Sequence, residues 1–586
     1  MILMAQNISW HGILHDISLQ ITPRAWTHII GPNGAGKSSL LKLLSGLEEP
    51  TSGDIFLDHK KLKNIPLLER ARAFAYVPQR LEALPDITVA QFVEQSLFAR
   101  KRPIPDIDRI LELTSLANDT DKRLTTLSGG ELQRAMIAAA IAQNTPMILL
   151  DEPTSALDIA QTLRIHALLR KLTDEGKTIV TVTHDLMSAS AKADFTILMN
   201  KGVCLWQGRG FAPVQRLSEV YELPMSHFDY LSDKFKTTAN TPDTCKCLVD
   251  ETTPSALERS HAIDDCTPNK RKTNACFFAL AALILILIIA PFVGSSVINI
   301  FNVSDQDRFI LTQLRIPRVL WGAGSGAALA CVGAALQAML QNPLATPYTL
   351  GIASGASLGA MIAIVLGVSS LALLASLSFL SAALTFLCIL FITAKFGFKT
   401  PTFCILAGVA ASIFCSSVAM VLQALATPLT AHQMMRWQMG GIDVVGYHST
   451  LLIPLILLCI AALTRLSEPL NLIAVDTSLA QTRGVNVTRT RQVTLLLTSL
   501  ASALVVCICG PISFVGLLVP MWLRHKYGAD LRIILPLCAT YGAMFILTAD
   551  TIARLLETVA PLPVGVIVSL IGIPAILFSF RFGKNL

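Results

Sequence analysis

Charged residues are scarce in the second half of this sequence. Between Val319 and Ala394, 76 consecutive residues include no Asp, Glu, Lys or Arg. Residues 275–586 contain 16 Lys and Arg and 8 Asp and Glu, which leaves 31 and 32 of the chain's 47 and 40 for residues 1–274. The excess positive charge of the second half is more typical of cytoplasmic Lys and Arg that orient membrane helices than of nucleic-acid binding. We therefore expect a lipid bilayer, and no nucleic acid, among the partners.

Two features of secreted proteins are also lacking. Residues Met1–Trp10 have neither a basic start nor an apolar run, so no secretory signal is recognised and the first domain is expected to stay in the cytoplasm. The 13 cysteines form no disulfide framework, because nine lie in or beside apolar stretches. Four residues in a polar stretch after the first domain have a spacing loosely like that of metal ligands, although a solvated, reduced linker is the simpler interpretation. They are Cys245, Cys247, His261 and Cys266.

The pattern of apolar residues divides the 586-residue chain into three parts. Residues 1–231 alternate short apolar strands with amphipathic helices, which predicts an α/β domain. Residues 232–274 lose this periodicity and end in a basic cluster at residues 270–272, which predicts a polar cytoplasmic linker. Residues 275–586 predict an all-α polytopic membrane domain, because a spanning helix needs roughly 20 apolar residues.

About ten transmembrane helices are expected in this last part. With the amino terminus inside, an even number of spans places most Lys and Arg of the connecting loops in the cytoplasm. The eighth segment is short and begins at Gly510-Pro511, which suggests a broken helix. Asn342-Pro343 and Pro520 are also expected to interrupt helices. The ten predicted segments are 275–293, 317–338, 348–366, 370–394, 402–424, 446–464, 492–509, 511–523, 533–551 and 563–580.

A glycine-rich loop in the first part has the sequence Gly-Pro-Asn-Gly-Ala-Gly-Lys-Ser over residues 31–38. It follows a predicted strand over Ala25–Ile30 and opens a predicted helix over Ser38–Leu47. Its backbone N–H groups can turn toward phosphate oxygens, Lys37 can reach the β- and γ-phosphates, and Ser38 can ligate Mg²⁺. The nucleotide ligands predicted here are Gly31, Asn33, Gly34, Gly36, Lys37, Ser38 and Ser39.

Acidic residues follow a second predicted strand, Met147–Leu150. Asp151 is the expected second Mg²⁺ ligand, and Glu152 is expected to polarise the attacking water. A β-branched run over Thr178–Thr183 ends in His184. Chemistry at the carboxyl ends of buried parallel strands is the usual arrangement in such a sheet.

A Leu-Ser-Gly-Gly-Glu-Leu-Gln-Arg motif covers residues 127–134. Its Ser-Gly-Gly turn offers a hydroxyl, two backbone donors and a positive helix end to a γ-phosphate. With this motif in order after the phosphate loop, the first domain resembles an ABC-transporter ATPase. The resemblance implies that two copies act head to tail, so that Ser128, Gly129 and Gly130 of one chain cap the ATP bound to the other.

The same resemblance implies roles for four further residues. Gln79 would sense Mg²⁺, water and the membrane domain, and His184 would contact the γ-phosphate. Asp158, in the Ser-Ala-Leu-Asp motif at 155–158, would belong to the nucleotide site. Trp10 lies where the family places an aromatic ring that stacks on adenine, with ordinary packing in an edge strand as the alternative.

Motifs of the second half together resemble the FecCD-type permeases of type II ABC importers, which carry iron–siderophores, haem or vitamin B12. In that family, arginines at such motifs receive glutamates of a periplasmic binding protein, which implies this role for Arg315, Arg318 and Arg554. The alternative is an internal pair with Asp550 or contact with lipid headgroups. The motifs lie at residues 314–318, 341–347, 350–359, 510–520, 549–554 and 562–566.

Residues 466–490 are predicted to form a cytoplasmic segment. By resemblance this is the element that couples the permease to the ATPase near Gln79, with Asp476, Ala480 and Gly484 as its coupling residues. The sequence departs from the family where an acidic pair is reduced to Asp476 with Thr477, and where Met521-Trp522 replaces a frequent His.

Three other features bear on the transport path. Gly322, Gly324, Gly326 and Ala327 are small enough to let helix backbones approach closely. The scarcity of acids within the spans favours a large organic chelate over a bare cation. A cluster in an outer loop invites two interpretations, haem or metal contact and packing of a gate by adaptable methionines. It consists of His432, Met434, Met435 and Met439.

Taken together, these patterns and the two resemblances imply an ATP-driven importer in the bacterial cytoplasmic membrane, with its ATPase domain in the cytoplasm. It would work as a homodimer with a periplasmic or lipoprotein solute-binding protein and would carry a metal chelate, an iron–siderophore ahead of haem or cobalamin. The alternative is an exporter of lipid or drug, which typically has about six spans. A third hypothesis is an ATPase module that regulates a channel-like or structural membrane domain.

Overall fold

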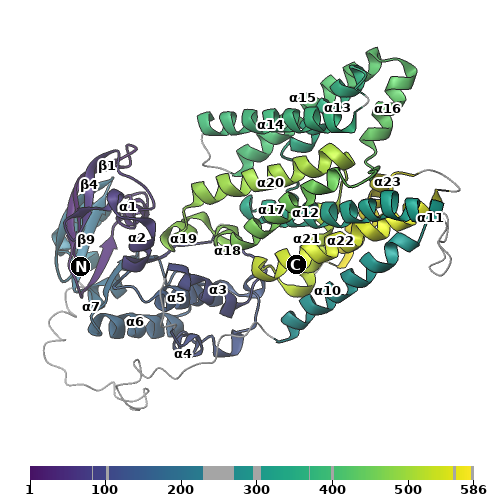
Figure 1. Cartoon of the computed structure of the whole chain (residues 1–586). Coiled ribbons are helices and arrows are strands. Elements are labelled where there is room, and N and C mark those ends of the chain that lie inside the picture. The colour runs from purple at the N-terminus through teal and green to yellow at the C-terminus, as the bar shows by residue number, and fades with distance from the viewer. Residues whose placement is uncertain are drawn as a thin grey trace. The chain divides into compact units, whose positions relative to one another are not determined.

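The computed structural model describes most of the chain and divides it into two compact units (Figure 1). The first unit contains Met1–Cys266 and Val475–Asn486, and the second contains Thr267–Ala474 and Val487–Leu586. The four linker residues with metal-like spacing and the predicted boundary at 231–232 lie outside the described residues, whereas the predicted boundary at 274–275 lies inside helix α10 (Lys270–Ile289). The described ranges are 1–81, 83–99, 105–228, 270–294, 305–368, 370–396, 401–557 and 562–582.

A six-stranded sheet forms the centre of the first unit, in the order β10-β9-β3-β8-β7-β6. All neighbouring strands are parallel except β10, which pairs antiparallel with β9. Strands β3, β7 and β8 are buried along their whole lengths, as expected for the centre of an α/β domain. The strands are β3 (Trp26–Ile30), β6 (Phe74–Val77), β7 (Met147–Asp151), β8 (Thr178–Val182), β9 (Phe195–Asn200) and β10 (Val203–Arg209).

A second, antiparallel sheet has the order β2-β1-β4-β5. Strand β1 pairs with both β2 and β4, so it is not an edge strand. The alternative interpretation of Trp10, which placed this residue in an edge strand, is wrong about the strand. Buried residues of both sheets, such as Ile8 and Ile29, belong to one hydrophobic core. The strands are β1 (Leu3–Trp10), β2 (Leu14–Ile21), β4 (Ser52–Leu57) and β5 (Lys60–Lys61).

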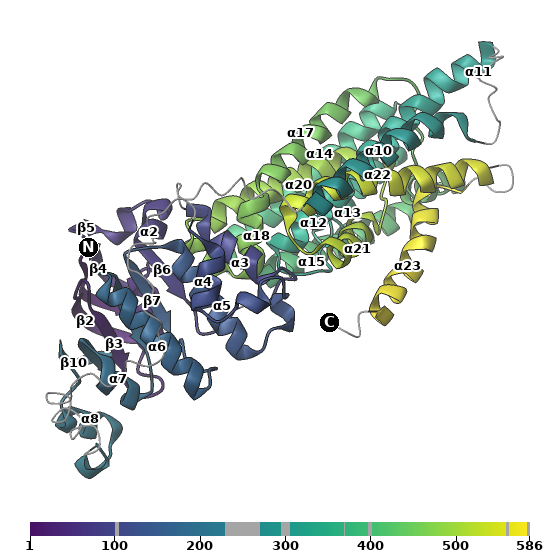
Figure 2. The ribbon, with the colours of Figure 1, turned by 90° about the horizontal axis from the view of Figure 1, so that it is seen from below.

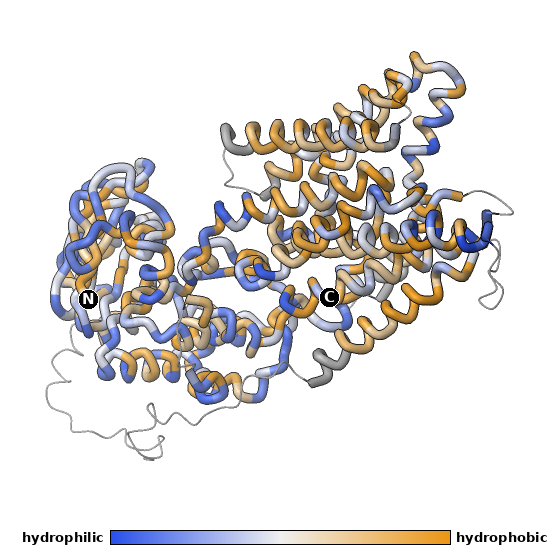
Figure 3. The backbone as a smooth tube through the Cα atoms, viewed as in Figure 1, coloured by the Kyte–Doolittle hydropathy of each residue, from blue (hydrophilic) through white to orange (hydrophobic). Residues whose placement is uncertain are grey.

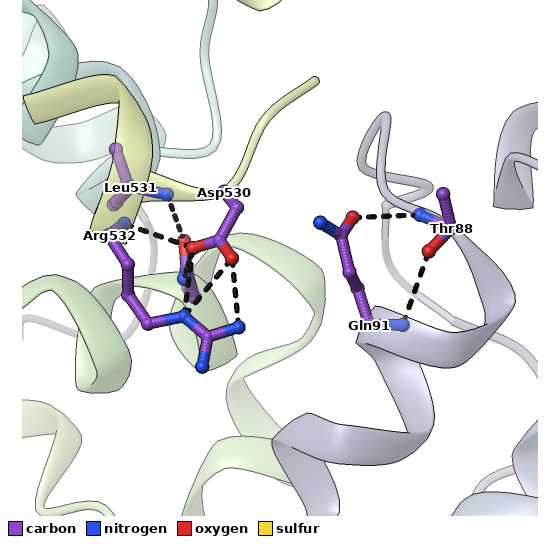
Figure 4. Close-up of polar contacts among 6 residues, drawn as sticks. Thr88, Gln91, Asp530, Leu531 and Arg532 are labelled. Carbon is purple, nitrogen blue, oxygen red and sulfur yellow. Dashed lines mark hydrogen bonds and ion pairs between the residues drawn. The ribbon is translucent and has the colours of Figure 1, made fainter. Parts of the chain in front are cut away.

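Several helices of the first unit begin at side chains that cap them. Thr88 and Gln91 form a reciprocal capping box at the start of α3, with bonds of 3.1 and 3.2 Å (Figure 4). The helices are α1 (Lys37–Leu44), α2 (Leu67–Ala73), α3 (Val89–Gln95), α4 (Ile107–Leu113), α5 (Gly129–Gln143), α6 (Ile159–Asp174), α7 (Leu186–Lys192), α8 (Val214–Tyr221) and α19 (Thr477–Thr482).

The second unit is helical, and each of the ten segments predicted to span a membrane contains a helix. Five helices of the described chain are long and apolar enough to cross a bilayer, or six if one bent pair counts as a span. The unit is therefore a membrane domain with at least five apolar helices, and the number ten stays a prediction. The helices are α10 (Lys270–Ile289), α11 (Asp305–Phe309), α12 (Ile316–Met339), α13 (Ile352–Val365), α14 (Leu371–Phe396), α15 (Pro401–Leu425), α16 (Pro428–Gln438), α17 (Ile453–Arg465), α18 (Ser467–Val475), α20 (Val487–Cys509), α21 (Val515–Tyr527), α22 (Leu531–Leu556) and α23 (Val564–Phe582).

Helix α12 lies at the centre of the second unit, against α17, α20, α21 and α22 (Figure 2). A Cβ atom at Gly326 would lie 2.1 Å from the carbonyl oxygen of Gly542, and one at Gly333 would lie 1.8 Å from that of Gly516. Such contacts confirm the predicted close approach of helix backbones at Gly326, which in lipid depends on small residues. Apolar residues dominate these helices (Figure 3).

Pro520 does not interrupt a helix as predicted, because α21 continues through it. A proline inside a helix leaves the carbonyl four residues earlier without its usual partner. Here that carbonyl belongs to Gly516, and the side chain amide of Gln337 donates to it at 3.1 Å. The predicted break at Gly510-Pro511 does occur, between the end of α20 and the start of α21.

A polar junction fixes the start of α22 within the second unit (Figure 4). Asp530 is buried and caps the helix, and the amide of Asn471 in α18 donates to it at 2.7 Å. The guanidinium of Arg532 binds the same carboxylate at 2.8 Å, and the oxygen of Asn471 accepts from the backbone N–H of Leu531 at 2.9 Å. These bonds satisfy the charge of Asp530 and join α18 to α22.

A buried histidine lies in the central strand of the first unit. His28 stacks on Trp26 with the ring centroids 5.0 Å apart, and neither ring nitrogen has a hydrogen-bond partner among the described residues. Burial, together with the positive charges of His166 and Lys192, lowers the pKa of His28 to about 3. In the unfolded chain the pKa lies near 6.5, so only the unfolded state binds a proton between these two values.

The first unit should consequently lose stability as the pH falls below about 6.5, and the loss should continue toward pH 3. Substitution of His28→Phe keeps a ring against Trp26 and removes this proton. We expect the apparent melting temperature of the full-length variant in detergent to fall less between pH 6.5 and 5 than that of the wild type. His15→Phe, at an exposed position, is the control, and equal pH dependence of all three proteins would contradict the assignment.

Candidate nucleotide site and membrane-domain charges

Four adjacent parallel strands carry the predicted nucleotide residues to one edge of the sheet. Strands β3, β8, β7 and β6 lie side by side in register. The phosphate loop follows β3, His184 follows β8, Glu152 follows β7, and Gln79 follows β6. Because the carboxyl ends of parallel strands meet at the same edge, residues 150 positions apart share one site.

The phosphate loop adopts a backbone that only glycine allows at its first position. Gly31 has φ of 150°, and a Cβ atom there would lie 2.1 Å from the carbonyl oxygen of Met199. Gly36, which caps α1, also has positive φ. The ammonium of Lys37 donates to the carbonyl oxygens of Gly31 at 2.7 Å and Pro32 at 2.9 Å, so it lies across the loop. Asn33 and Gly34 are exposed, and Ser38 and Ser39 are half-buried.

Two oxygen ligands that suit Mg²⁺ lie together at the start of α1. The hydroxyl of Ser38 donates to the carboxylate of Asp151 at 2.9 Å. Burial raises the pKa of Asp151, although the bond from Ser38 opposes that shift. A hydroxyl and a carboxylate are hard ligands of the kind that Mg²⁺ shares with phosphate oxygens and water. This pair therefore fits the predicted Mg²⁺ site, while Gln79, the third predicted ligand, donates to Glu152.

Glu152 is at the centre of the predicted catalytic residues. The amide of Gln79 donates to its carboxylate at 2.7 Å, and Nδ1 of His184 lies 3.6 Å from its other oxygen. Glu152 itself has φ of 47°, a left-handed backbone conformation that non-glycine residues seldom adopt. The structure thus brings together all three residues predicted for catalysis, with Glu152 more buried than His184.

The signature motif begins α5, and the Ser-Ala-Leu-Asp motif lies against it. Ser128 caps α5, and a Cβ atom at Gly130 would lie 3.2 Å from the carbonyl oxygen of Ala156. Asp158 caps α6 by accepting from the backbone N–H of Gln161 at 2.7 Å. The nucleotide contacts predicted for Ser128, Asp158 and Gly129, like the adenine contact of Trp10, stay predictions. The ring nitrogen of Trp10 is buried, and the side chain packs partly against the core.

The predicted coupling residues belong to the first unit rather than to a continuous second domain. Asp476 caps α19 and accepts from the backbone N–H groups of Ser478 and Leu479 at 2.8 and 2.9 Å. Ala480 is buried. Gly484 has φ of 93°, and a Cβ atom there would lie 2.9 Å from the side chain of Leu68 in α2.

Sequence reasoning missed two side chains that hold this segment. The amide of Gln143, the last residue of α5, donates to the carbonyl oxygens of Ala71 at 2.6 Å and Thr482 at 3.5 Å. The guanidinium of Arg483 lies over the ring of Phe92 at 5.0 Å. No local motif marks either residue, because both contacts join parts of the chain hundreds of positions apart.

The arginines predicted to dock a binding protein are largely internal. Arg318 binds Asp550 at 2.8 Å, and Arg554 lies 3.0 Å from the other oxygen of the same carboxylate. Arg554 also donates to the carbonyl oxygens of Ala290 and Val293, and Arg315 donates to that of Pro291 at 3.1 Å. The pair with Asp550 is the alternative interpretation that the sequence left open. Docking of a binding protein stays a prediction, and Arg318 is the most exposed of the three arginines.

The cluster predicted in an outer loop instead lies on helix α16 and at its C-cap, and its side chains differ in burial. Met434 is fully buried beside Met361 and Ala419, whereas Met435 and Met439 are exposed. His432 is exposed as well. Among the described residues, no three His, Cys, Asp or Glu side chains are placed to share a metal ion. The burial of Met434 agrees with the packing interpretation for that residue.

The fold and the site define an ABC-type ATPase joined to a helical membrane domain, in which ATP hydrolysis is coupled to transport. The chain belongs to the FecCD transport family, whose family model matches residues 279–582. The family model of the ABC transporter ATPase matches residues 14–155. The two matches together confirm the fusion of ATPase and permease that the motifs predicted.

Named relatives match the two halves separately. The hemin transport system permease protein HmuU of Yersinia pestis is 35% identical over 288 residues, 48% of this chain and 86% of that protein. The vitamin B12 import system permease protein BtuC of Salmonella paratyphi A is 34% identical over 276 residues, 47% of this chain and 84% of that protein. The iron(3+)-hydroxamate import ATP-binding protein FhuC of Bacillus subtilis is 37% identical over 208 residues, 33% of this chain and 76% of that protein.

Glu152→Gln removes the carboxylate that we expect to activate water while it keeps the shape of the side chain. ATP hydrolysis by the full-length variant should fall about 100-fold or more, because loss of a general base has effects of that size. Binding of a fluorescent ATP analogue should stay close to wild type. Glu175→Gln, at an exposed turn, is the control, and wild-type turnover in Glu152→Gln would refute the assigned base.

Proposed function

We propose that this chain imports a metal chelate across the bacterial cytoplasmic membrane at the expense of ATP. The observation that carries the proposal is the union, in one polypeptide, of an ABC-type ATPase domain and a FecCD permease. The relatives named above are a hemin permease, a vitamin B12 permease and an iron-hydroxamate ATPase. An iron–siderophore is the first candidate substrate, with haem and cobalamin next.

The chain would act as a homodimer. One copy has one phosphate loop and one signature motif, whereas a head-to-tail ATP site needs a loop from one ATPase and a signature from another. ATP on Lys37 and the loop N–H groups of one chain would meet Ser128 of its partner. Ser38 and Asp151 would hold Mg²⁺, which offsets the charge developing on the phosphates, and Glu152 would take the proton of the attacking water.

The membrane domain would cross the bilayer ten times, with the ATPase in the cytoplasm. Closure of the ATPase pair would move α19, because Gln143 and Leu68 contact its segment within the first unit. A periplasmic or lipoprotein solute-binding protein would deliver the chelate at the opposite face. Its acidic residues would approach Arg318 and compete with Asp550 for that guanidinium.

Transport by reconstituted protein tests the proposal directly. Proteoliposomes with ATP on the ATPase side should accumulate a ferric hydroxamate, haemin or cobalamin only when a periplasmic extract of the source organism is added. Light scattering should give the mass of two chains with ATP and Mg²⁺. Extrusion of lipid or drug without uptake would favour the exporter, and full turnover by a monomer would end the dimer proposal.

Gly484→Ala tests the coupling segment. The added Cβ would press on Leu68, at 2.9 Å, in a backbone conformation that alanine adopts with strain. Uptake of the transported chelate should fall about fivefold or more relative to ATP hydrolysis, since an overpacked contact costs about 1 kcal/mol or more and about 1 kcal/mol changes an equilibrium by that factor. Gly176→Ala is the matched control, because Gly176 has φ of 94° but open space around it. Equal ratios of uptake to hydrolysis in both variants would contradict the coupling role.

A further inference from the structure

Glu131, the fifth residue of the signature motif, lies between Ser128 and a lysine outside the motif. One carboxylate oxygen, Oε2, accepts from the hydroxyl of Ser128 at 2.8 Å and from its backbone N–H at 2.7 Å. The other oxygen, Oε1, accepts from the ammonium of Lys122 at 2.7 Å. Lys122 thus fixes the orientation in which the carboxylate meets Ser128.

This arrangement uses the groups of Ser128 that a γ-phosphate would need. A serine hydroxyl carries one hydrogen and can donate it to one acceptor at a time. Here the hydrogen goes to Glu131, so a phosphate oxygen must displace a carboxylate to obtain it. The carboxylate also places a negative charge beside the position that the phosphate would take, and Lys122 offsets that charge.

We propose that Glu131 and Lys122 are positioning residues that set how strongly Ser128 binds the γ-phosphate of ATP. Glu131 holds the hydroxyl away from the phosphate, and Lys122 weakens that competition by sharing the carboxylate. The inference rests on the proposed function, in which Ser128 of one copy faces the nucleotide of the other. Neither residue has to touch the nucleotide itself.

The ionisation of Glu131 supports this role. Hydrogen bonds from Lys122 and Ser128 lower the pKa of Glu131 to about 2. The side chain is therefore charged at every pH at which the enzyme would be assayed. Lys122 has a second acidic neighbour, Asp119, but at 3.7 Å, so Glu131 is its closer partner.

A purely structural interpretation makes a different prediction. Ser128 and Glu131 form a capping box at the start of α5, and glutamine serves at the third position of such a box as well as glutamate does. If stabilisation of α5 were the whole role, Glu131→Gln would leave ATP binding unchanged. At this position, glutamate differs from glutamine only in its charge and in its ionic bond to Lys122.

Steady-state hydrolysis of Mg²⁺-ATP by full-length protein in nanodiscs separates these interpretations. Glu131→Gln should lower KM for ATP about three- to tenfold, the range expected when a competing hydrogen bond to a charged acceptor becomes one to a neutral acceptor. Lys122→Met should raise KM by a similar factor, because the carboxylate is then held by Ser128 alone. The double variant should resemble Glu131→Gln, since no charge remains to be offset.

Lys61→Met is the matched control, because Lys61 forms a 2.6 Å ion pair with Asp54 in the antiparallel sheet; its KM should stay at the wild-type value. An equal rise in KM on Lys122→Met with and without Glu131→Gln would overturn the proposal, as would an unchanged KM in Glu131→Gln. Glu131→Gln alone decides the matter if Lys122→Met melts early. Failure of the underlying dimer has a separate signature, namely full turnover by protein whose mass in light scattering is that of one chain.

Discussion

The carboxyl ends of adjacent parallel strands meet at one edge of a sheet, and the nucleotide site of this protein depends on that constraint. Pairing of β3 with β8, β8 with β7 and β7 with β6 brings the phosphate loop, Glu152, His184 and Gln79 to the same edge. The short bonds from Gln79 to Glu152 and from Ser38 to Asp151 follow from this order. A change of strand order would separate groups whose chemistry requires contact.

The membrane domain obeys a different constraint, the cost of placing charge in an apolar surrounding. Within the described helices, Asp550 is buried and is shared by Arg318 and Arg554, while carbonyl oxygens of residues 290–293 accept from Arg554 and Arg315. A buried charge without such partners would be far more costly. Any acidic partner that reaches Arg318 must therefore compensate for the loss of a bond that already exists.

Local patterns in the sequence predicted the central strands, the phosphate loop and the presence of a helix in each predicted apolar segment, because apolar runs and glycine-rich turns report directly on local structure. Contacts between distant residues carried no such signal. Arg318 meets Asp550 across 232 positions, β1 lies in the middle of its sheet rather than at an edge, and Gln337 compensates for Pro520 in another helix. The same holds for α19, whose neighbours Leu68 and Gln143 lie in the first unit.

Within the first unit, helix α5 connects the signature motif, where we propose that ATP binds, to the proposed coupling segment. Ser128 caps its beginning, and Gln143 at its end donates to the carbonyl oxygen of Thr482. Fifteen residues of helix span about 22 Å, and a helix of that length transmits displacement better than a loop does. A phosphate that took the hydroxyl of Ser128 from Glu131 would act on the helix that also holds the proposed coupling segment. On that proposal, the strength of the Glu131–Ser128 bond would bear on transport as well as on affinity for ATP.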